Sequence, residues 1–130
     1  METGRFKFRF WHKSTKKMLG CYGFNEHCTF ANTLDGINTE YNPCATKDCV
    51  LMQSTGLKDK NEQFIYEGDI VYRKGLKRYN GEKLYSKVVW DSTFAAFVLS
   101  DENGIHRMPY NLSKTEIVGN IYENNEFEGI

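Results

Sequence analysis

Turn-forming residues interrupt short apolar runs at close intervals through residues 51–72 of this 130-residue chain. The interrupting residues are Gly56, Asp59, Asn61, Gly68 and Asp69. Strands that stop and reverse after a few residues are typical of a compact β domain, whereas a helix needs a longer apolar period. Because no long helical period occurs elsewhere in the chain, we expect a mainly β protein.

One of these interruptions separates the apolar residues 64–66 from the apolar residues 70–72. Gly68 readily adopts the positive φ of a tight bend, and the Asp69 carboxylate can accept a hydrogen bond from its own downstream backbone. We therefore predict an ordinary turn between two core strands. A ligand role for Glu67 or Asp69 is the less favoured alternative.

Two Asn-Gly dipeptides predict β-hairpins in the second half of the chain, because both residues of such a turn adopt positive φ. The first, at 80–81, separates strands expected over 70–78 and 82–90. The second, at 103–104, separates strands expected over 94–100 and 105–108, and a closing strand is expected over 117–121. Trp90 follows two valines and precedes an aspartate turn, and we expect this side chain to be buried in its strand.

Residues 5–11 alternate between phenylalanine and other side chains, which predicts a strand with one buried face. The residues expected on the other face are Arg5, Lys7, Arg9 and Trp11. Residues 12–17 would form a turn, and a returning strand would begin at Met18. Residues 5–17 contain six basic and no acidic residues. The favoured interpretation is the solvated face of an edge strand, and the alternative is a phosphate-binding surface with Trp11 as a stacking platform.

A second basic region lies on the hairpin predicted around residues 80–81. Its basic residues are Arg73, Lys74, Lys77, Arg78, Lys83 and Lys87, and they are opposed only by Glu82. The formal net charge of zero argues against non-specific DNA binding by the whole molecule, but it is compatible with a local basic face. The candidate binding surface therefore comprises Arg5, Lys7, Arg9, Trp11, Arg73, Lys74, Lys77, Arg78, Tyr79, Lys83 and Tyr85.

Residues 20–49 show the least regular pattern, and we expect irregular structure or short strands there. This segment contains all four cysteines, at positions 21, 28, 44 and 49. Six residues separate Cys21 from Cys28 and four separate Cys44 from Cys49, whereas zinc ligand pairs usually come from tighter turns. We expect reduced thiols that serve as small buried hydrophobes and no bound metal; zinc is the alternative.

No sequence motif predicts a catalytic residue or a cofactor. The chain has no phosphate-binding glycine loop, no H-E-x-x-H and no G-x-S-x-G, and its histidines lie apart at positions 12, 27 and 106. The first ten residues are charged and alternating, which argues against a signal peptide, and no apolar run is long enough to span a bilayer. We therefore expect a cytoplasmic protein that is not an enzyme and does not bind membranes.

Several motifs, in a fixed order along the chain, resemble one protein family. They are K-F-R-F-W at 7–11, K-K-M at 16–18, L-M-Q-S-T-G-L-K-D-K-N at 51–61, I-Y-E-G-D-I-V at 65–71, V-V-W-D at 88–91 and I-V-G-N-I-Y-E-N at 117–124. In these segments the chain resembles the YopX family of phage and prophage proteins. The resemblance implies a β-rich protein with an SH3-like barrel in its C-terminal half, and it implies no known activity. No counterpart of residues 20–49 can be placed in the family from these motifs, and residues 124–126 lack the proline that often follows this ending.

Taken together, these observations predict two regions. Residues 1–60 would form an N-terminal β-hairpin region with an irregular cysteine-containing segment, and residues 61–130 would form the SH3-like barrel domain. We expect a non-enzymatic binding module of phage or mobile-element biology, whose partner is nucleic acid or a phage or host protein. The competing hypothesis is a homo-oligomeric assembly protein, in which the acidic tail from Glu116 onward binds the basic stretches of a neighbouring copy. An enzyme with a dispersed site is the least favoured alternative.

Overall fold

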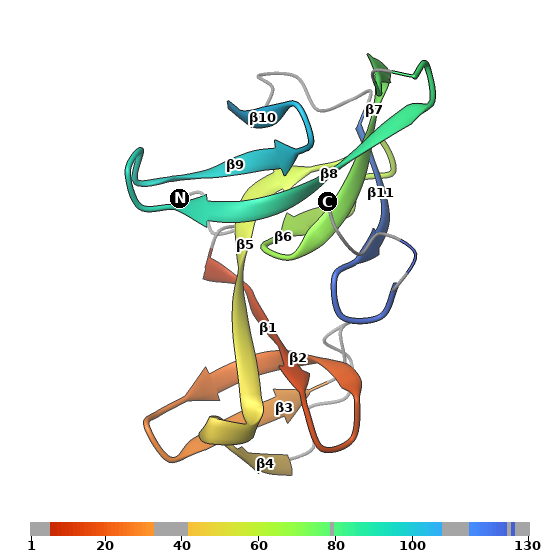
Figure 1. Ribbon diagram of the computed structural model, residues 1–130. Helices are drawn as coiled ribbons and strands as arrows, with labels where there is room; N and C mark the ends of the chain where they lie inside the picture. Colours follow the sequence, from red (N-terminus) through yellow and green to blue (C-terminus); the bar gives the residue numbers. More distant parts are fainter. Residues whose placement is uncertain (1–5, 33–41, 79, 108–114, 125, 127–130) are drawn as a thin grey trace. The chain divides into compact units, whose positions relative to one another are not determined.

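The computed structural model describes residues 6–32, 42–78, 80–107, 115–124 and 126, and almost all of its regular elements are strands (Figure 1). The predicted mainly β fold is confirmed. The chain divides into two compact units, Met1–Ser54 and Thr55–Ile130. The boundary falls within one long strand, β5 (Cys49–Lys58), which begins in the first unit and ends in the second.

The first unit is a curved antiparallel sheet. Its elements are β1 (Phe8–His12), β2 (Lys17–Phe24), β3 (Cys28–Asn32), β4 (Asn42–Ala45), a single 3-10 turn η2 (Thr46–Asp48) and the start of β5. The strand order is β4-β3-β2-β1-β5. The predicted N-terminal hairpin is present, and the Lys16 amide donates to the His12 carbonyl in its turn. The irregular segment also contains short strands, as expected.

Strand β1 is not the edge strand that the sequence predicts. It pairs with β2 on one side and with β5 on the other, so both of its backbone edges are used. Phe10 is fully buried as expected, but Phe6 precedes the strand and is 54% exposed. Arg9, predicted to lie on a solvated face, is only 8% exposed. A central strand is covered more completely than an edge strand, and this explains the difference.

The second unit contains a strongly curved antiparallel sheet of five strands in the order β10-β9-β8-β7-β11 (Figure 1). Its strands are β7 (Asp69–Lys77), β8 (Lys83–Asp91), β9 (Ala96–Asp101), β10 (Gly104–Arg107) and β11 (Thr115–Asn120); β6 (Phe64–Tyr66) neighbours β5. Its core is formed by Ile65, Val71, Val88 and Leu99, with Phe97 and Ile117 packed against them. The SH3-like barrel expected here stays a prediction.

Glycine bends are confirmed at the three predicted positions, but the predicted positive φ of Asn103 is wrong, because the β9–β10 turn residues are Glu102 and Asn103, between the paired Asp101 and Gly104. Gly68, Gly81 and Gly104 have φ values of 89°, 88° and 114°, a region that strains residues with a Cβ. Asp69 acts differently from the prediction, because its Oδ2 accepts a hydrogen bond of 2.7 Å from the upstream amide of Tyr66. The carboxylate therefore closes the β6–β7 turn from its downstream side.

Trp90 is not buried as the sequence predicts: it is 50% exposed. Along β8, Leu84, Ser86 and Val88 alternate with more exposed residues and point into the unit. Trp90 continues this inward series, but it is the second-last residue of the strand and lies beyond the end of the core cluster. The ring packs edge-on against Phe97 instead.

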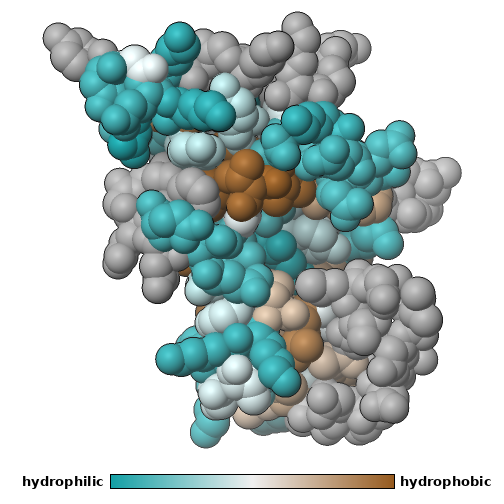
Figure 2. Space-filling view, turned by 90° about the vertical axis from the view of Figure 1, so that its right-hand side faces the viewer, coloured by the Kyte–Doolittle hydropathy of each residue, from teal (hydrophilic) through white to brown (hydrophobic). Residues whose placement is uncertain are grey.

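Hydrophilic side chains predominate among the described residues on the face shown in Figure 2. On the face shown in Figure 2, a small apolar area is bounded by hydrophilic side chains. The exposed large apolar residues are Phe6, Phe24, Leu57, Trp90, Phe94, Ile105 and Ile121. They are spread over both units, so apolar exposure alone does not identify a docking surface. Among the residues that the structure describes, no helix combines the length and apolar character needed to cross a membrane.

Candidate binding surface

The first basic stretch is only partly available at the surface. Lys7 is exposed, Trp11 is half-buried, and little of Arg9 is accessible. Arg5 lies outside the described residues. Lys13 and Lys16 of the β1–β2 turn and Lys17 at the start of β2 are exposed. This stretch therefore presents lysines, but its arginine at position 9 has little surface to offer a partner.

Part of the second basic stretch lies on one face of the β7–β8 hairpin. Lys77 pairs with Lys83, Tyr72 with Tyr85, and Ile70 with Lys87 across the antiparallel ladder. Directly opposed residues share a face, and so do residues two apart on one strand. We refer to Tyr72, Lys77, Lys83, Tyr85 and Lys87 as the lysine–tyrosine array.

The side chains of the array contact one another. The Tyr72 and Tyr85 ring centroids are 5.8 Å apart at an interplanar angle of 49°. The Lys83 Nζ lies 5.2 Å from the Tyr72 ring centroid, within the range of a cation–π interaction. Lys77 and Lys83 are exposed, whereas both tyrosines are half-buried. The array thus combines half-buried rings with exposed ammonium groups at Lys77 and Lys83.

Other predicted residues of this hairpin lie elsewhere. Arg73 pairs with Thr115 of β11 and shares the Val71 face, which is opposite to the array. Lys74 lies within β7, where the register with β8 shifts, and Tyr79 lies outside the described residues. The structure therefore brings together Lys77, Lys83 and Tyr85 from the predicted set and adds Tyr72 and Lys87.

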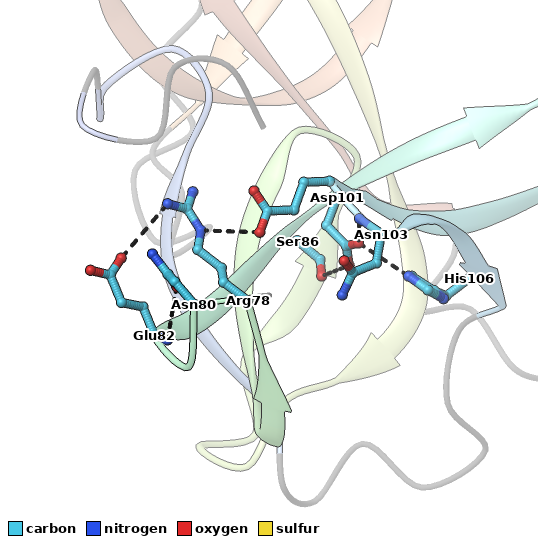
Figure 3. Close-up of polar contacts among 8 residues, drawn as sticks. Arg78, Asn80, Glu82, Ser86, Asp101, Asn103 and His106 are labelled. Carbon is cyan, nitrogen blue, oxygen red and sulfur yellow. Dashed lines mark hydrogen bonds and ion pairs between the residues drawn. The ribbon is translucent and has the colours of Figure 1, made fainter.

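Arg78 is engaged by two carboxylates at the end of the hairpin (Figure 3). Its Nη1 lies 3.9 Å from Glu82 Oε2, and its Nε lies 3.7 Å from Glu102 Oε1 in the β9–β10 turn. Sequence proximity identifies Glu82 as a partner, but Glu102 approaches only through the fold. The positive charge of Arg78 is therefore countered within the chain.

The β9–β10 turn that contains Glu102 is fixed by Asp101, whose side chain is fully buried (Figure 3). Asp101 Oδ2 accepts a 2.8 Å hydrogen bond from the Ser86 hydroxyl. Its Oδ1 accepts one from the Asn103 amide and lies 3.1 Å from His106 Nε2. A hydrolytic triad needs the histidine to contact the serine hydroxyl, whereas here both groups contact the carboxylate. The arrangement fits a structural role.

A similar arrangement closes the β1–β2 turn of the first unit. His12 Nε2 lies 3.1 Å from Asp48 Oδ2, and the Ser14 hydroxyl donates to the same oxygen. His12 Nδ1 contacts the Thr15 hydroxyl at 2.7 Å. The hydrogen bond from Ser14 lowers the pKa of Asp48, with smaller contributions from His12 and Lys13. Again the serine hydroxyl contacts the carboxylate and not the imidazole.

Three cysteine side chains of the first unit are described, and none of these three forms a disulfide bond. Burial raises the pKa of Cys21, Cys44 and Cys49, so the neutral thiol is favoured. Within the described residues, no three or more histidine, cysteine or acidic side chains form a group able to hold a metal ion. The absence of zinc stays a prediction, since the Cys28 side chain is not described.

Comparisons with known proteins concern the family and the fold. A family model described as YopX protein matches residues 7–127. The chain is similar to the crystal structure of protein EF1440 from Enterococcus faecalis, with a TM-score of 0.66 and 24% sequence identity. That similarity covers 92% of this chain and 95% of the other. No curated protein matches the chain. At this identity, the structural neighbour supports the fold and adds nothing about activity.

Proposed function

Because the chain belongs to the YopX family, whose model spans residues 7–127, we propose a function that needs no catalytic group: a binding module for an acidic partner. The binding surface is the lysine–tyrosine array of the second unit. The module would serve phage or mobile-element biology, as the family resemblance suggests. The serine–aspartate–histidine contacts described above support a non-enzymatic role, since neither activates a nucleophile.

The observation on which the proposal rests is the charge of the array. Lys77, Lys83 and Lys87 lie on one face, and in the described part of the chain no ion pair joins any of them to a carboxylate. The acidic residues nearby have other cationic partners. Glu82 and Glu102 contact Arg78, and Glu116, which pairs with Tyr72 on the β11 side, lies 3.0 Å from the Lys60 ammonium. The array therefore presents two exposed cations, Lys77 and Lys83, and the half-buried Lys87 to an external anion.

The test is binding of two anionic probes, heparin and a short duplex DNA, at low and moderate salt. Changing Lys77, Lys83 and Lys87 together to Ala should lower affinity at least about tenfold and reduce the salt dependence by up to about three units. The matched control changes Lys13, Lys16 and Lys17 together to Ala, which removes the same charge from the β1–β2 turn and the start of β2. Equal losses in both variants, or no binding at low salt, would refute the proposal.

A second copy of the chain is the competing partner. The acidic tail beginning at Glu116 is the complementary surface for such self-association. Two of its acids have contacts within their own chain, however: Glu116 with Lys60, and Glu123 with the Asn120 amide. These contacts favour an external partner over the tail of a neighbour. Light scattering at low and high salt separates the two, because a homo-oligomer that dissociates with salt would support self-association.

A further inference from the structure

We infer that the tyrosine pair makes the lysine–tyrosine array a site for an unpaired nucleic-acid strand. This inference rests on the proposed function and specifies the class of acidic partner. Lysines alone would bind any polyanion, including an acidic peptide or a duplex. The two opposed rings are the feature that distinguishes these partners.

The order of side chains along β8 suits a single-stranded nucleic acid, which needs cations for its phosphates and rings for its bases. Lys83, Tyr85 and Lys87 are two residues apart, so cation, ring and cation follow one another on one face. At the rise of a β-strand, successive members are about 7 Å apart. On β7, Lys77 and Tyr72 extend the cation and ring positions across the ladder. Proteins that bind single strands combine a positively charged track for the backbone with aromatic rings for the bases.

The contacts within the array keep the rings in place before a ligand arrives. Tyr72 packs against Tyr85 and has the Lys83 ammonium near its ring. Both rings are half-buried, so little side-chain freedom remains to be lost on binding. The Lys83 ammonium lies over the Tyr72 ring, so a base that stacks on that face would displace it, and the freed ammonium could then pair with a phosphate.

Unpaired bases suit this surface better than a duplex does. Stacking on a ring requires an exposed base face, and in a duplex these faces are covered by the neighbouring base pairs. The rings lie on a sheet between lysines and are half-buried, so they form a surface platform and not a wedge that separates base pairs. An acidic peptide would use the lysines but would gain little from the rings.

The inference is tested with a fluorescent oligothymidylate, a duplex of similar length and polyglutamate, each at about 50 mM and about 200 mM salt. Tyr72→Ala and Tyr85→Ala should each weaken oligothymidylate binding roughly 5- to 150-fold, the range expected for loss of one base–ring stack. Tyr72→Phe and Tyr85→Phe, which keep the ring, should retain most of the affinity. None of these four changes should alter the binding of polyglutamate.

Circular dichroism verifies the fold of each variant, and a second measurement avoids substitution altogether. Ultraviolet crosslinking of the unmodified protein to a bromouracil-containing single strand should label peptides that include Tyr72 or Tyr85. Labelling confined to other peptides would overturn the inference even if an alanine variant failed to fold.

The outcomes separate the inference from the proposed function. If the lysine changes weaken all polyanions but the tyrosine changes leave the oligothymidylate unaffected, the inference is wrong and the proposed function stands. Equal affinity for the duplex and the single strand would also overturn the inference. If no polyanion binds at low salt, both fail.

Discussion

Trp90 lies directly opposite Phe97 in the β8–β9 ladder, with ring centroids 5.2 Å apart, yet Trp90 is 50% exposed. The two rings form an edge-to-face pair at the surface end of the strands. A tryptophan in this position stabilises the fold through one aromatic contact and partial burial, because it does not lie at the centre of the core.

We therefore expect Trp90→Ala to cost about 1–2 kcal/mol of unfolding free energy, less than the loss of a fully buried aromatic residue. Leu99→Ala, at a fully buried core position, should cost about 2–5 kcal/mol. Urea unfolding of both variants measures the difference. Equal costs would show that Trp90 is part of the core.

Any side chain larger than that of glycine at position 119 is predicted to destabilise the protein while Asn124 is present. A Cβ at position 119 would lie 2.5 Å from Asn124 Oδ1, the atom that accepts a hydrogen bond from the Asn120 amide. Gly119→Ala must displace that side chain, and we expect a cost of about 1–3 kcal/mol.

A double-mutant cycle provides the control. Asn124→Ala removes the obstacle, so the double variant should be more stable than the sum of the single changes predicts, with a coupling of about 0.5–3 kcal/mol. Strict additivity in urea unfolding would mean that the steric contact with Asn124 does not limit position 119.

Asp59 is 5% exposed, and its carboxylate connects two parts of the second unit. Oδ1 accepts hydrogen bonds from the amides of Asn61 and Gln63, and Oδ2 accepts one of 3.0 Å from Ile117 in β11. In Asp59→Asn, the side-chain NH₂ would face an amide donor, and we expect a loss of about 1–3 kcal/mol.

The matched control is Asp91→Asn, the same chemical change in a solvent-exposed turn. There Oδ1 alone accepts from the amides of Thr93 and Phe94, so an asparagine oxygen can replace it. The loss of unfolding free energy in Asp91→Asn should stay below about 0.5 kcal/mol. Comparable losses for both variants in denaturant unfolding would contradict the role assigned to Asp59.

The Ser14–Asp48 contact predicts a specific pH dependence. The hydrogen bond from Ser14 lowers the pKa of Asp48 in the folded protein below its ordinary value of 3.8. The ionised Asp48 carboxylate therefore makes its full contribution to folding stability above pH 3.8. That contribution is lost as the pH falls through the folded-state pKa. Ser14→Ala should be less stable than the unmodified protein at neutral pH, and the difference should disappear in acid.

Ser92→Ala, which changes an exposed serine in the β8–β9 turn, is the control, because its effect should not vary with pH. A stability difference for Ser14→Ala that is independent of pH would disprove the assigned cause. Thermal unfolding across the acidic range provides the measurement.

The cysteines are predicted to react slowly and to hold no zinc. Burial raises the pKa of Cys21, Cys44 and Cys49, and only the thiolate reacts rapidly. Alkylation by iodoacetamide should be slow at neutral pH, should accelerate as the pH rises, and should reach all four thiols in denaturant. One zinc ion per chain in elemental analysis, lost together with the fold on chelation, would contradict this prediction.

The turns were predictable from sequence because their cause is local. Gly68, Gly81 and Gly104 need positive φ, and their neighbours reveal this without any tertiary information. Burial is not local in the same way. The alternation around Arg9 and Trp90 identifies their faces, but whether a face is covered depends on which strands lie beside it and on where the core ends.

The lysine–tyrosine array was only half predictable for a related reason. A two-residue turn at 80–81 places residue 79 opposite 82 and, counted back along the ladder, Tyr72 opposite Val89. In the structure Lys77 lies opposite Lys83, already one residue out of that register, and the further shift between Tyr72 and Lys77 brings Tyr72 opposite Tyr85. Gly75, an isolated glycine within the strand pattern, is a sequence signal for a bulge in this part of β7. It does not give the size of the shift, so the ring pair became visible only in the structure.

Strand β5 determines how the two units can be prepared separately. Its first residues, Cys49–Gln53, pair with β1, and its later part neighbours β6. An N-terminal fragment that stops at Ser54 cuts β5 in two. An N-terminal fragment that stops at Lys58 contains all of β5, so the C-terminal fragment then lacks the strand that neighbours β6. A complementary pair of fragments must therefore overlap, with residues 49–58 present in both.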